Sequence, residues 1–442
     1  MYKNKKIFII GLARSGYECA KLLLKYNNDI TLVEYNNEDS HIEELKKLGA
    51  NVIICPKEEQ ASYLDNSFDM VVRNPGVPLD SPCVVKANEL NLRITGEVDI
   101  AYNLMPEDIK IIAITGSNGK TTTTTMIYEM MEQANLPVHL GGNIGYPVTS
   151  LVKSIKSKDI LVLEISDHQL VNMQDFKSDI SVLTNIVESH LDFHGTFEKY
   201  CAAKKKIFNN HTQKDLAIIN ASNDVSLALT KDIKSKKEYF SSVSKAEVYV
   251  DANAIYYHEK IIDLKDIKLV GKHNYENIMA AIRVVKEFGV DNQIIKNYLG
   301  DFGGVEHRME YVKEHNKVAY YNDAKSTNVE ATLTALKSFN KPIHLLLGGL
   351  DRGHSFIDLA KYKDAITCVY AYGEVKGRIL DFCNKYEIDC TSTETLKEAT
   401  NAAITNAKEN SVVLLSPACA SWDQYKKFED RGQEFKDIIN NL

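Results

Sequence analysis

The hydrophobic positions of the chain fall into short apolar runs of strand type, most of them followed by a segment with helical periodicity. At the N-terminus, residues 6–10 predict a strand, residues 17–25 a helix and residues 30–33 a second strand. Further strands are predicted at residues 51–54 and 70–73. Alternating strands and helices predict a parallel sheet of the Rossmann type in this first part of the chain.

Two more series of the same kind follow. The second contains predicted strands at residues 111–114, 159–165 and 181–186 and a strand, turn and helix start at 268–281, while the polar residues 231–245 predict a surface excursion. The third follows a glycine-rich hinge at residues 300–308, with predicted strands at 319–321, 343–347, 367–371 and 411–415. We therefore expect three α/β domains: an N-terminal Rossmann-like domain (1–99), a central P-loop ATPase-like domain with a mostly parallel sheet (100–304) and a C-terminal Rossmann-like domain (305–442).

Composition narrows the class of protein. With 44% hydrophobic and 26% charged residues, the chain of 442 residues has the make-up of a soluble globular protein. The net charge of −7, without a long basic block, gives no reason to expect nucleic acid binding. No apolar run approaches the length of a membrane span. The eight cysteines show no CxxC spacing, which predicts reduced thiols and a cytoplasmic location.

A phosphate-binding turn stands between the strand at 111–114 and the next helix. Its residues are Gly116, Ser117, Asn118, Gly119, Lys120, Thr121 and Thr122. The glycines allow backbone N–H groups to approach phosphate oxygens, the lysine would neutralise them, and the hydroxyl of Thr121 would bind Mg²⁺. Ile114 replaces the first glycine of the general Walker pattern, and the alternative is a flexible turn. The strand before it and the helix after it favour a nucleotide site.

Polar residues after the other central strands are further candidates. Glu164 ends a strand and is placed to hold Mg²⁺, although it could be an edge carboxylate without a ligand. His190 follows the next strand and could contact a metal or a substrate, although a lone histidine is more often structural. Lys204 belongs to a run of three lysines that is ordinarily a solvated surface. Asn274 and Asn277 suit the edge of a purine or the cap of a helix.

The loop GLARSG at residues 11–16 has Ala13 where a dinucleotide fingerprint has its second glycine, and Glu34 follows the second strand. Three interpretations remain open: an NAD site, a site for another nucleotide such as a UDP-sugar, or a structural turn. No other feature of hydride chemistry accompanies the loop.

Taken together, these motifs resemble those of the Mur ligase family in all three predicted domains. The matching segments are GLARSG (11–16), NPGV (74–77), TGSNGKTTT (115–123), GGNIG (141–145), LEISDHQL (163–170), ESHLD (188–192), AAK (202–204), GKHNYEN (271–277), EHRME (306–310), YNDAKSTN (321–328), GGLDRG (348–353) and SPACASWDQYKKFEDRGQEF (416–435). The last segment is the most specific, because it resembles the members that add D-glutamate and not the sister ligases or folylpolyglutamate synthetase.

The resemblance implies an ATP-dependent ligase of peptidoglycan precursor synthesis. Such an enzyme joins D-glutamate to UDP-N-acetylmuramoyl-L-alanine (UDP-MurNAc-L-Ala) through an acyl phosphate and releases ADP and phosphate. Because the participants are anionic, catalysis would rest on positioning and charge neutralisation. The expected partners are these small molecules, with no nucleic acid and no membrane span, and the expected state is a monomer. Domain closure around ATP is also expected.

The resemblance also assigns roles to residues of this sequence. It implies catalytic roles for Lys120, Glu164, His190, Lys204 and Lys325. It implies two Mg²⁺ ions, held by Thr121, Glu164, His190 and Lys204, the last as a carbamate. ATP contacts outside the turn would come from Asn274, Asn277, Arg308 and Asp323. The UDP-sugar would contact Ser15, Glu34, Asn74, Asn143, Ser166, Gln169 and His190, and D-glutamate would contact Thr327, Arg352, Ser421 and Phe428. Two segments depart from the family pattern: Glu34-Tyr35-Asn36, and Asp167-His168, where many relatives have Ser-Phe.

Three rival functions remain at this stage. A sister ligase would add another amino acid and would differ around Arg352 and Ser421. A nucleotide-binding regulatory protein would keep the fold without ligation, but it would not need every catalytic residue named above. An oxidoreductase would use the loop at residues 11–34 and would change the fluorescence of NAD(P)H.

Overall fold

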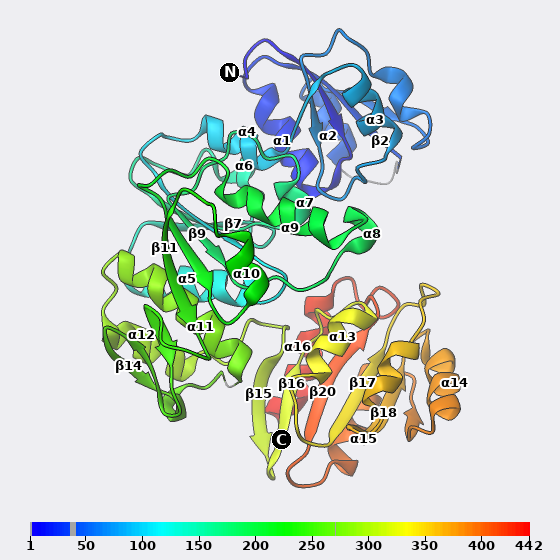
Figure 1. Cartoon of the computed structure of the whole chain (residues 1–442). Coiled ribbons are helices and arrows are strands. Elements are labelled where there is room, and N and C mark those ends of the chain that lie inside the picture. The colour runs from blue at the N-terminus through cyan, green and yellow to red at the C-terminus, as the bar shows by residue number, and fades with distance from the viewer. Residues whose placement is uncertain (1, 36–40, 270) are drawn as a thin grey trace. The chain divides into compact units, whose positions relative to one another are not determined.

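The computed structural model describes residues 2–35, 41–269 and 271–442, and it contains three sheets flanked by helices (Figure 1). The chain forms two compact units, Met1–Gly300 with the first two sheets and Asp301–Leu442 with the third. This arrangement confirms the predicted class of three α/β domains with mostly parallel sheets. Within the described ranges, no helix combines the length and the apolar character needed to cross a membrane.

The first sheet has five parallel strands in the order β3-β2-β1-β4-β5. Its strands are β1 (Lys6–Ile10), β2 (Asp29–Glu34), β3 (Asn51–Ile54), β4 (Met70–Arg73) and β5 (Arg93–Thr95), and its helices are α1 (Ala13–Leu24), α2 (His41–Lys47), η1 (Gln60–Tyr63) and α3 (Pro82–Glu89). Ile7 and Ile9 of β1 enter one hydrophobic core, and Phe8 and Ile10 enter the core on the opposite face. The continuous apolar run that predicts β1 follows from this burial on both faces.

Helix α4 (Glu97–Leu104) crosses residue 99, where the first domain is predicted to end. It packs against α1 of the first sheet and against α6 (Val148–Leu151) of the second. The first two sheets therefore share a helical layer and belong to one compact unit.

The second sheet has nine strands in the order β14-β13-β12-β11-β10-β9-β6-β8-β7. All neighbours from β7 to β12 pair in parallel, and β13 and β14 add antiparallel pairs. The strands are β6 (Lys110–Thr115), β7 (Val138–Gly142), β8 (Ile160–Glu164), β9 (Ile180–Leu183), β10 (Leu216–Asn220), β11 (Lys236–Ser241), β12 (Val248–Val250), β13 (Ala254–Tyr257) and β14 (Glu259–Asp263). The helices are α5 (Lys120–Gln133), α7 (Asp167–Leu170), α8 (Leu191–His194), α9 (Phe197–Lys205), η2 (Lys206–Phe208), α10 (Asp224–Leu229), η3 (Leu264–Asp266), α11 (Lys272–Glu287) and α12 (Asn292–Asp301).

Two sequence predictions in this unit are wrong. The segment predicted as a surface excursion contains β11, which pairs with β10 and β12. Only Phe240 and Ser241 of this strand are buried, so its apolar signal is weak. The strand predicted at the start of 268–281 is absent from the described residues there, whereas the predicted helix is present as α11.

The third sheet has the order β15-β16-β20-β17-β18-β19, and all its neighbours are parallel except β15 and β16. Its strands are β15 (Glu310–His315), β16 (Val318–Asn322), β17 (Ile343–Gly348), β18 (Ile366–Tyr372), β19 (Cys390–Ser392) and β20 (Val412–Ala418). Its helices are α13 (Val329–Leu336), η4 (Ile357–Tyr362), α14 (Lys376–Tyr386), α15 (Leu396–Asn406) and α16 (Phe428–Asn440). Separate hydrophobic cores lie on its two faces, and the four strands predicted for this part are confirmed.

Candidate active site

The predicted phosphate turn joins the carboxyl end of β6 to the first residue of α5. Gly116 has a φ of +148°, and a Cβ atom there would come within 1.9 Å of Thr184 Oγ1. Gly119 has a φ of +81°, and a Cβ atom there would come within 2.0 Å of Asn277 Oδ1. Both positions therefore require glycine, for backbone conformation and for space. The second contact also brings Asn277 of α11 to the turn.

The loop after β9 fixes this turn. The Asn118 amide donates to Asn185 Oδ1 at 3.0 Å, and the Ser117 amide donates to the Asn185 carbonyl at 2.8 Å. The Thr184 hydroxyl donates to the Asn118 carbonyl at 2.6 Å. Thr184 and Asn185 were not predicted from the sequence, because their roles depend on the adjacency of β6 and β9. A turn held in this way is preorganised for an anion.

Two lysines converge on the carbonyl of Gly116. Lys120 Nζ donates to it at 2.8 Å and to the Ser117 carbonyl at 2.9 Å. Lys204 Nζ donates to the same Gly116 oxygen at 2.9 Å. Lys204 lies on α9 and its side chain is fully buried, so the interpretation of its lysine run as a wholly solvated surface is wrong for this residue.

Glu164 ends β8 directly beside β6, with Ile114 as its partner in the register. Asn143 Nδ2 donates to Glu164 Oε1 at 2.6 Å. The other oxygen, Oε2, is buried and has no hydrogen-bond partner among the described residues. A buried carboxylate oxygen without a donor fits a cation, and Mg²⁺ prefers such oxygen ligands. Thr121 lies in the first turn of α5, so two of the predicted Mg²⁺ ligands, Thr121 and Glu164, stand at the same end of the parallel sheet.

An ionic cluster surrounds Lys204. Its Nζ lies 3.2 Å from Asp167 Oδ1, and Asp167 Oδ2 lies 2.8 Å from His194 Nε2 and 3.1 Å from His168 Nδ1. Burial raises the pKa of Asp167, but His168, Lys204 and His194 together outweigh burial and hold that pKa well below its usual range. Burial lowers the pKa of Lys204, although Asp167 opposes the change.

His190 is the N-cap of α8, in the left-handed conformation with a φ of 53°. Desolvation lowers its pKa, which favours the neutral imidazole that binds metals. Ligand atoms of Asp167, His168 and His190 all lie within 4.8 Å of one another, so these three residues could hold a metal ion. Of these three residues, only His190 was predicted from the sequence as a metal ligand.

Ser166 and Gln169 form a capping box at the start of α7. The Gln169 amide donates to Ser166 Oγ at 3.3 Å, and the Ser166 amide donates to Gln169 Oε1 at 2.9 Å. The box positions Asp167 within the same helical turn. Asn274 lies in the first turn of α11, one turn before Asn277.

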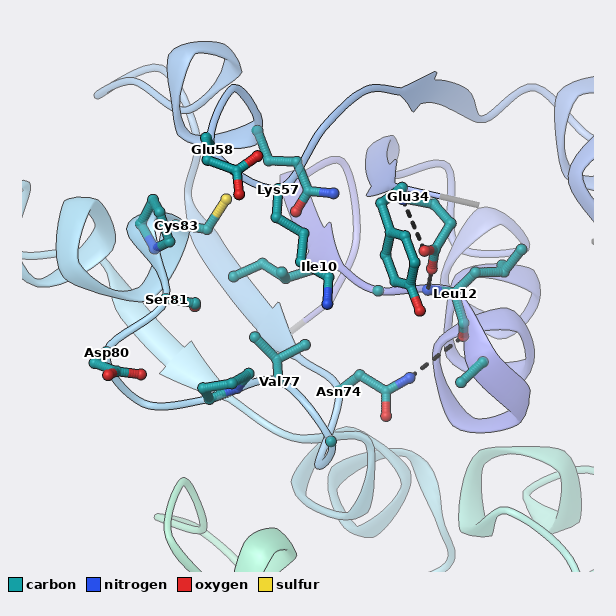
Figure 2. Close-up of a pocket in the computed structure, with 17 residues that line it drawn as sticks. Ile10, Leu12, Glu34, Lys57, Glu58, Asn74, Val77, Asp80, Ser81 and Cys83 are labelled. Carbon is teal, nitrogen blue, oxygen red and sulfur yellow. Dashed lines mark hydrogen bonds between the residues drawn. The ribbon is translucent and has the colours of Figure 1, made fainter. Parts of the chain in front are cut away.

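The first sheet carries a separate cavity of about 630 Å³, which Figure 2 shows at the ends of its strands. Glu34 and Asn74 line it, whereas Ser15 lies on α1 outside its lining and Asn36 falls outside the described residues. Glu34 Oε2 accepts from the Leu12 amide at 2.7 Å, and Asn74 Nδ2 donates to the Leu12 carbonyl at 3.4 Å.

These two contacts hold the loop at residues 11–16 against the rim of the cavity. Lys57, which Figure 2 shows reaching into the cavity, was missed in the sequence analysis. Its Nζ lies 4.3 Å from the centroid of the Tyr35 ring.

In the second unit, Asp323 follows β16 and is almost fully buried. It accepts from Ser326 Oγ at 2.5 Å, from Ser416 Oγ at 2.7 Å and from the Met309 amide at 3.1 Å. Burial nevertheless raises the pKa of Asp323 to about 6. Arg308 directly precedes Met309, so this network ties two of the predicted ATP contacts to one loop.

Lys325 and Phe428 line one cavity of about 530 Å³, together with His307. Arg352 and Ser421 belong to another group, on the loops after β17 and β20. The Leu350 amide donates to the Ala420 carbonyl at 2.9 Å, which places these loops side by side.

The Arg352 guanidinium lies 4.6 Å from the centroid of the Trp422 ring. The Thr327 amide donates to the Lys325 carbonyl at 2.9 Å, which places Thr327 beside the first group. Arg431 was not predicted from the sequence. It is fully buried and donates to the carbonyls of Ala324 and Cys419.

Family models match all three parts of this architecture. Residues 5–96 match the Mur ligase MurD-like N-terminal domain, residues 114–285 the Mur ligase middle domain and residues 307–419 the glutamate ligase domain of Mur ligases. The chain belongs to the Mur ligase family. The resemblance inferred from the motifs is confirmed.

Full-length relatives agree with this assignment. The chain is 41% identical to a UDP-N-acetylmuramoylalanine–D-glutamate ligase from Geobacillus sp. (strain WCH70), over 100% of this chain and 98% of that protein. It is 38% identical to a protein of the same name from Bacillus mycoides (strain KBAB4), with the same coverage of both chains.

Solved structures of other Mur ligases share the fold. A UDP-N-acetylmuramate–alanine ligase from Thermotoga maritima is 20% identical, with a TM-score of 0.58 over 99% of both chains. MurF from Acinetobacter baumannii is 15% identical, with a TM-score of 0.59 over 93% of this chain and 92% of that one.

Proposed function

We propose that the chain is the ATP-dependent ligase that adds D-glutamate to UDP-MurNAc-L-Ala and releases ADP and phosphate. Similarity along the full length to relatives of that name supports the choice of substrates. The observation that supports the chemistry is the carboxylate of Glu164. One of its oxygens is buried without a hydrogen-bond partner in the described part of the chain, at the sheet end that also bears the phosphate turn.

In this reaction the carboxylate of the acceptor attacks the γ-phosphorus of ATP, and ADP leaves. The amine of D-glutamate then attacks the carbonyl carbon of the acyl phosphate, and phosphate leaves. Lys120 and the turn would hold the phosphates, and Lys325 would contact the transferred phosphoryl group and the acceptor carboxylate. Thr121 and Glu164 would hold Mg²⁺, which neutralises phosphate charge when bound.

The contacts with UDP-MurNAc-L-Ala, with D-glutamate and with the rest of ATP are proposed from the family resemblance as well. Glu34 and Asn74 would bind the uridine part, and Ser15, Asn143, Ser166, Gln169 and His190 would follow along the sugar. Arg352, Ser421, Thr327 and Phe428 would bind D-glutamate, where the planar guanidinium of Arg352 suits a carboxylate. Asn274, Asn277, Arg308 and Asp323 would contact the nucleoside and phosphates of ATP. We expect the enzyme to act as a cytoplasmic monomer.

The resemblance predicts two further features. One is a second Mg²⁺ beside His190, which the nearby ligand atoms of Asp167 and His168 favour. The other is a carbamate on Lys204, which would add an anionic oxygen ligand. Both stay predictions.

The deciding experiment measures phosphate release with ATP, Mg²⁺ and UDP-MurNAc-L-Ala, and offers D-glutamate, L-glutamate and other amino acids separately. We expect release that requires both the acceptor and D-glutamate. Lys120→Ala should lower kcat by at least about 100-fold, because it removes the cation of the turn. Lys110→Ala is the matched control, since Lys110 is exposed at the opposite end of β6 and should leave kcat unchanged.

Two other outcomes would replace the proposal. Release with a different amino acid would identify a sister ligase with the same mechanism. ATP binding without release for any amino acid would favour the regulatory protein.

A further inference from the structure

The cavity of the first sheet has an acidic lining that contains a single cation (Figure 2). Glu34, Glu58 and Asp80 line it, and Lys57 is the one basic residue among its described lining residues. Three carboxylates would repel a phosphate group, so the lining favours an uncharged group as the occupant. Lys57 is then placed to contact polar atoms of that group.

The order of the strands separates the two halves of a bound nucleotide. In a sheet of this type the diphosphate lies at the turn after the first strand, where the following helix begins. That turn is the loop at residues 11–16, which leads into α1. The nucleoside half then lies over the next strands, β2 and β3, which pair in parallel. Tyr35 follows β2 and Lys57 comes after β3, so both stand at the nucleoside half.

Glu34 fixes the backbone that carries Tyr35. Its Oε1 accepts from the Tyr35 amide at 2.7 Å, and its Oε2 accepts from the Leu12 amide at 2.7 Å. Glu34 is buried, whereas Tyr35 is 61% exposed. An exposed aromatic ring on a fixed backbone, at the wall of a cavity, offers a flat surface on which a base can stack.

The ammonium of Lys57 lies on this surface in the absence of a ligand. Its Nζ is 4.3 Å from the centroid of the Tyr35 ring, which is a cation–π contact. A base that stacks on the ring would take the place of the ammonium. Because the lysine stem is long and flexible, the ammonium would then lie beside the edge of the base.

An ammonium group distinguishes the two common pyrimidine bases. It offers three donors and no acceptor. At position 4 uracil presents a carbonyl oxygen, which accepts a hydrogen bond, whereas cytosine presents an amino group, which donates. A lysine at this edge therefore forms a hydrogen bond with uracil and meets a second donor in cytosine.

We propose that Tyr35 and Lys57 bind the uracil base of the acceptor nucleotide. Tyr35 stacks on the base, and Lys57 donates a hydrogen bond to the oxygen at position 4. Lys57 thereby determines the preference for uracil over cytosine, while Glu34 holds the backbone of Tyr35. This inference rests on the proposed function, because it takes the acceptor to be a uridine nucleotide.

NMR titrations of the full chain with UDP and with CDP test the role of Lys57. We expect the wild-type chain to bind UDP about 10-fold more tightly than CDP, the effect of one hydrogen bond to a charged donor. Lys57→Met should weaken UDP binding by about 10-fold and change CDP binding by less than about twofold. Lys57→Arg keeps a cation with donors only and should retain the preference.

Tyr35 should show a different pattern. Tyr35→Ala should weaken the binding of UDP and CDP by the same factor, about 10-fold, because every base has a face that can stack. Tyr35→Phe keeps the ring and should bind both nucleotides as the wild-type chain does. Lys47→Met is the control for Lys57→Met, because Lys47 is exposed on α2 outside the lining of the cavity and should affect neither nucleotide.

Three results would overturn the inference. A preference for UDP that persists in Lys57→Met would show that Lys57 does not contact the base, and equal binding of UDP and CDP by the wild-type chain would show that the base is not distinguished. Both results leave the proposed function intact, because the titrations do not depend on ligase turnover. Binding of neither nucleotide by the wild-type chain would contradict the acceptor of the proposed function as well.

Discussion

At the scale of single residues, Glu164 combines a cost in stability with the role in metal binding proposed for it. One of its oxygens accepts from Asn143, and the other is buried without a hydrogen-bond partner among the described residues. A buried charge of this kind destabilises the folded chain unless a cation or a donor satisfies it. The residue should therefore respond in opposite directions to tests of stability and of metal affinity.

We expect Glu164→Gln to weaken the apparent affinity for Mg²⁺ in the presence of ADP by about 10- to 100-fold. The same change should leave the melting temperature of the metal-free protein equal or higher, because it removes the buried charge. Calorimetric titration and thermal unfolding measure the two effects. Glu107→Gln, at an exposed position, should change neither. A lower melting temperature with unchanged Mg²⁺ affinity would assign Glu164 a purely structural role.

Glu97 predicts a pH dependence of stability. It is buried at the start of α4, where Oε2 accepts from the Thr149 amide at 3.0 Å. Burial raises the pKa of Glu97 to about 7, above the value of 4.5 expected for an exposed glutamate. The folded state therefore binds a proton more tightly than the unfolded state, and this stabilisation is lost as pH rises through 7.

Between pH 5 and pH 8 the free energy of unfolding of the wild-type chain should fall by about 2–3 kcal/mol relative to that of Glu97→Gln. Denaturant titrations of both proteins at several pH values measure the difference. Glu89→Gln, an exposed change on α3, should follow the wild-type curve. Parallel curves for the wild-type chain and Glu97→Gln would show that Glu97 titrates normally.

The site residues that could be predicted from the sequence are those that belong to a contiguous motif. Glu164 ends one strand and Lys120 follows another, and both strands are visible as apolar runs, so the place of these residues at the sheet end could be predicted. Asp167 contacts Lys204, and Thr184 contacts Asn118, and in both pairs the two residues are far apart in the chain. No local sequence pattern predicts such contacts. Lys204 itself was selected only by resemblance, because its neighbours in sequence suggest an exposed surface.

At the scale of elements, the phosphate turn works only if β6, β9 and α11 keep their spacing. Gly116 meets the side chain of Thr184 after β9, and Gly119 meets Asn277 on α11. A methyl group at Gly116 would also meet the backbone of Asn185 and must move that segment or the turn, whereas at Gly119 it would displace the Asn277 side chain. The turn is thus a meeting point of three elements, although its motif belongs to one segment of the chain.

Gly116→Ala should weaken Mg·ADP binding by at least about 100-fold, since a shift of the order of 1 Å is enough to misplace bound phosphates. It should also lower the free energy of unfolding by about 1–3 kcal/mol through overpacking. Gly377→Ala on α14 is the control, because a Cβ atom there meets nothing within 4 Å and a helical alanine is favourable. Calorimetry measures nucleotide binding and chemical unfolding measures the stability of both variants. Normal nucleotide binding by Gly116→Ala would mean that the turn tolerates the added methyl group.

How well the strands could be predicted follows from their burial. Strands β8, β9, β17 and β20 are buried along their whole length, and each is mostly apolar in sequence. By contrast, β11 to β14 form one side of the central sheet and carry exposed or half-buried residues among their apolar ones. Their pattern was too weak to separate from a polar loop.

At the scale of the whole molecule, each compact unit has its own hydrophobic cores. Among the residues that the structure describes, three cores lie within Met1–Gly300 and two within Asp301–Leu442. The predicted site residues are divided between the units as well, with Lys120 and Glu164 in the first and Lys325 and Arg352 in the second. Independent cores make independent folding of the units a reasonable expectation.

We therefore expect a fragment of residues 1–300 to unfold cooperatively. The fragment should bind UDP-MurNAc-L-Ala with an affinity within about threefold of that of the full chain, because the cavity of about 630 Å³ lies wholly inside the fragment. The fragment should release no phosphate from ATP with D-glutamate present, since Lys325 and Arg352 are missing. Calorimetry and the phosphate assay measure the two properties, with Lys325→Ala in the full chain as the matched loss of a single group. Phosphate release by the fragment would place all the groups needed for the first chemical step in Met1–Gly300, and Lys325 would lose its proposed catalytic role.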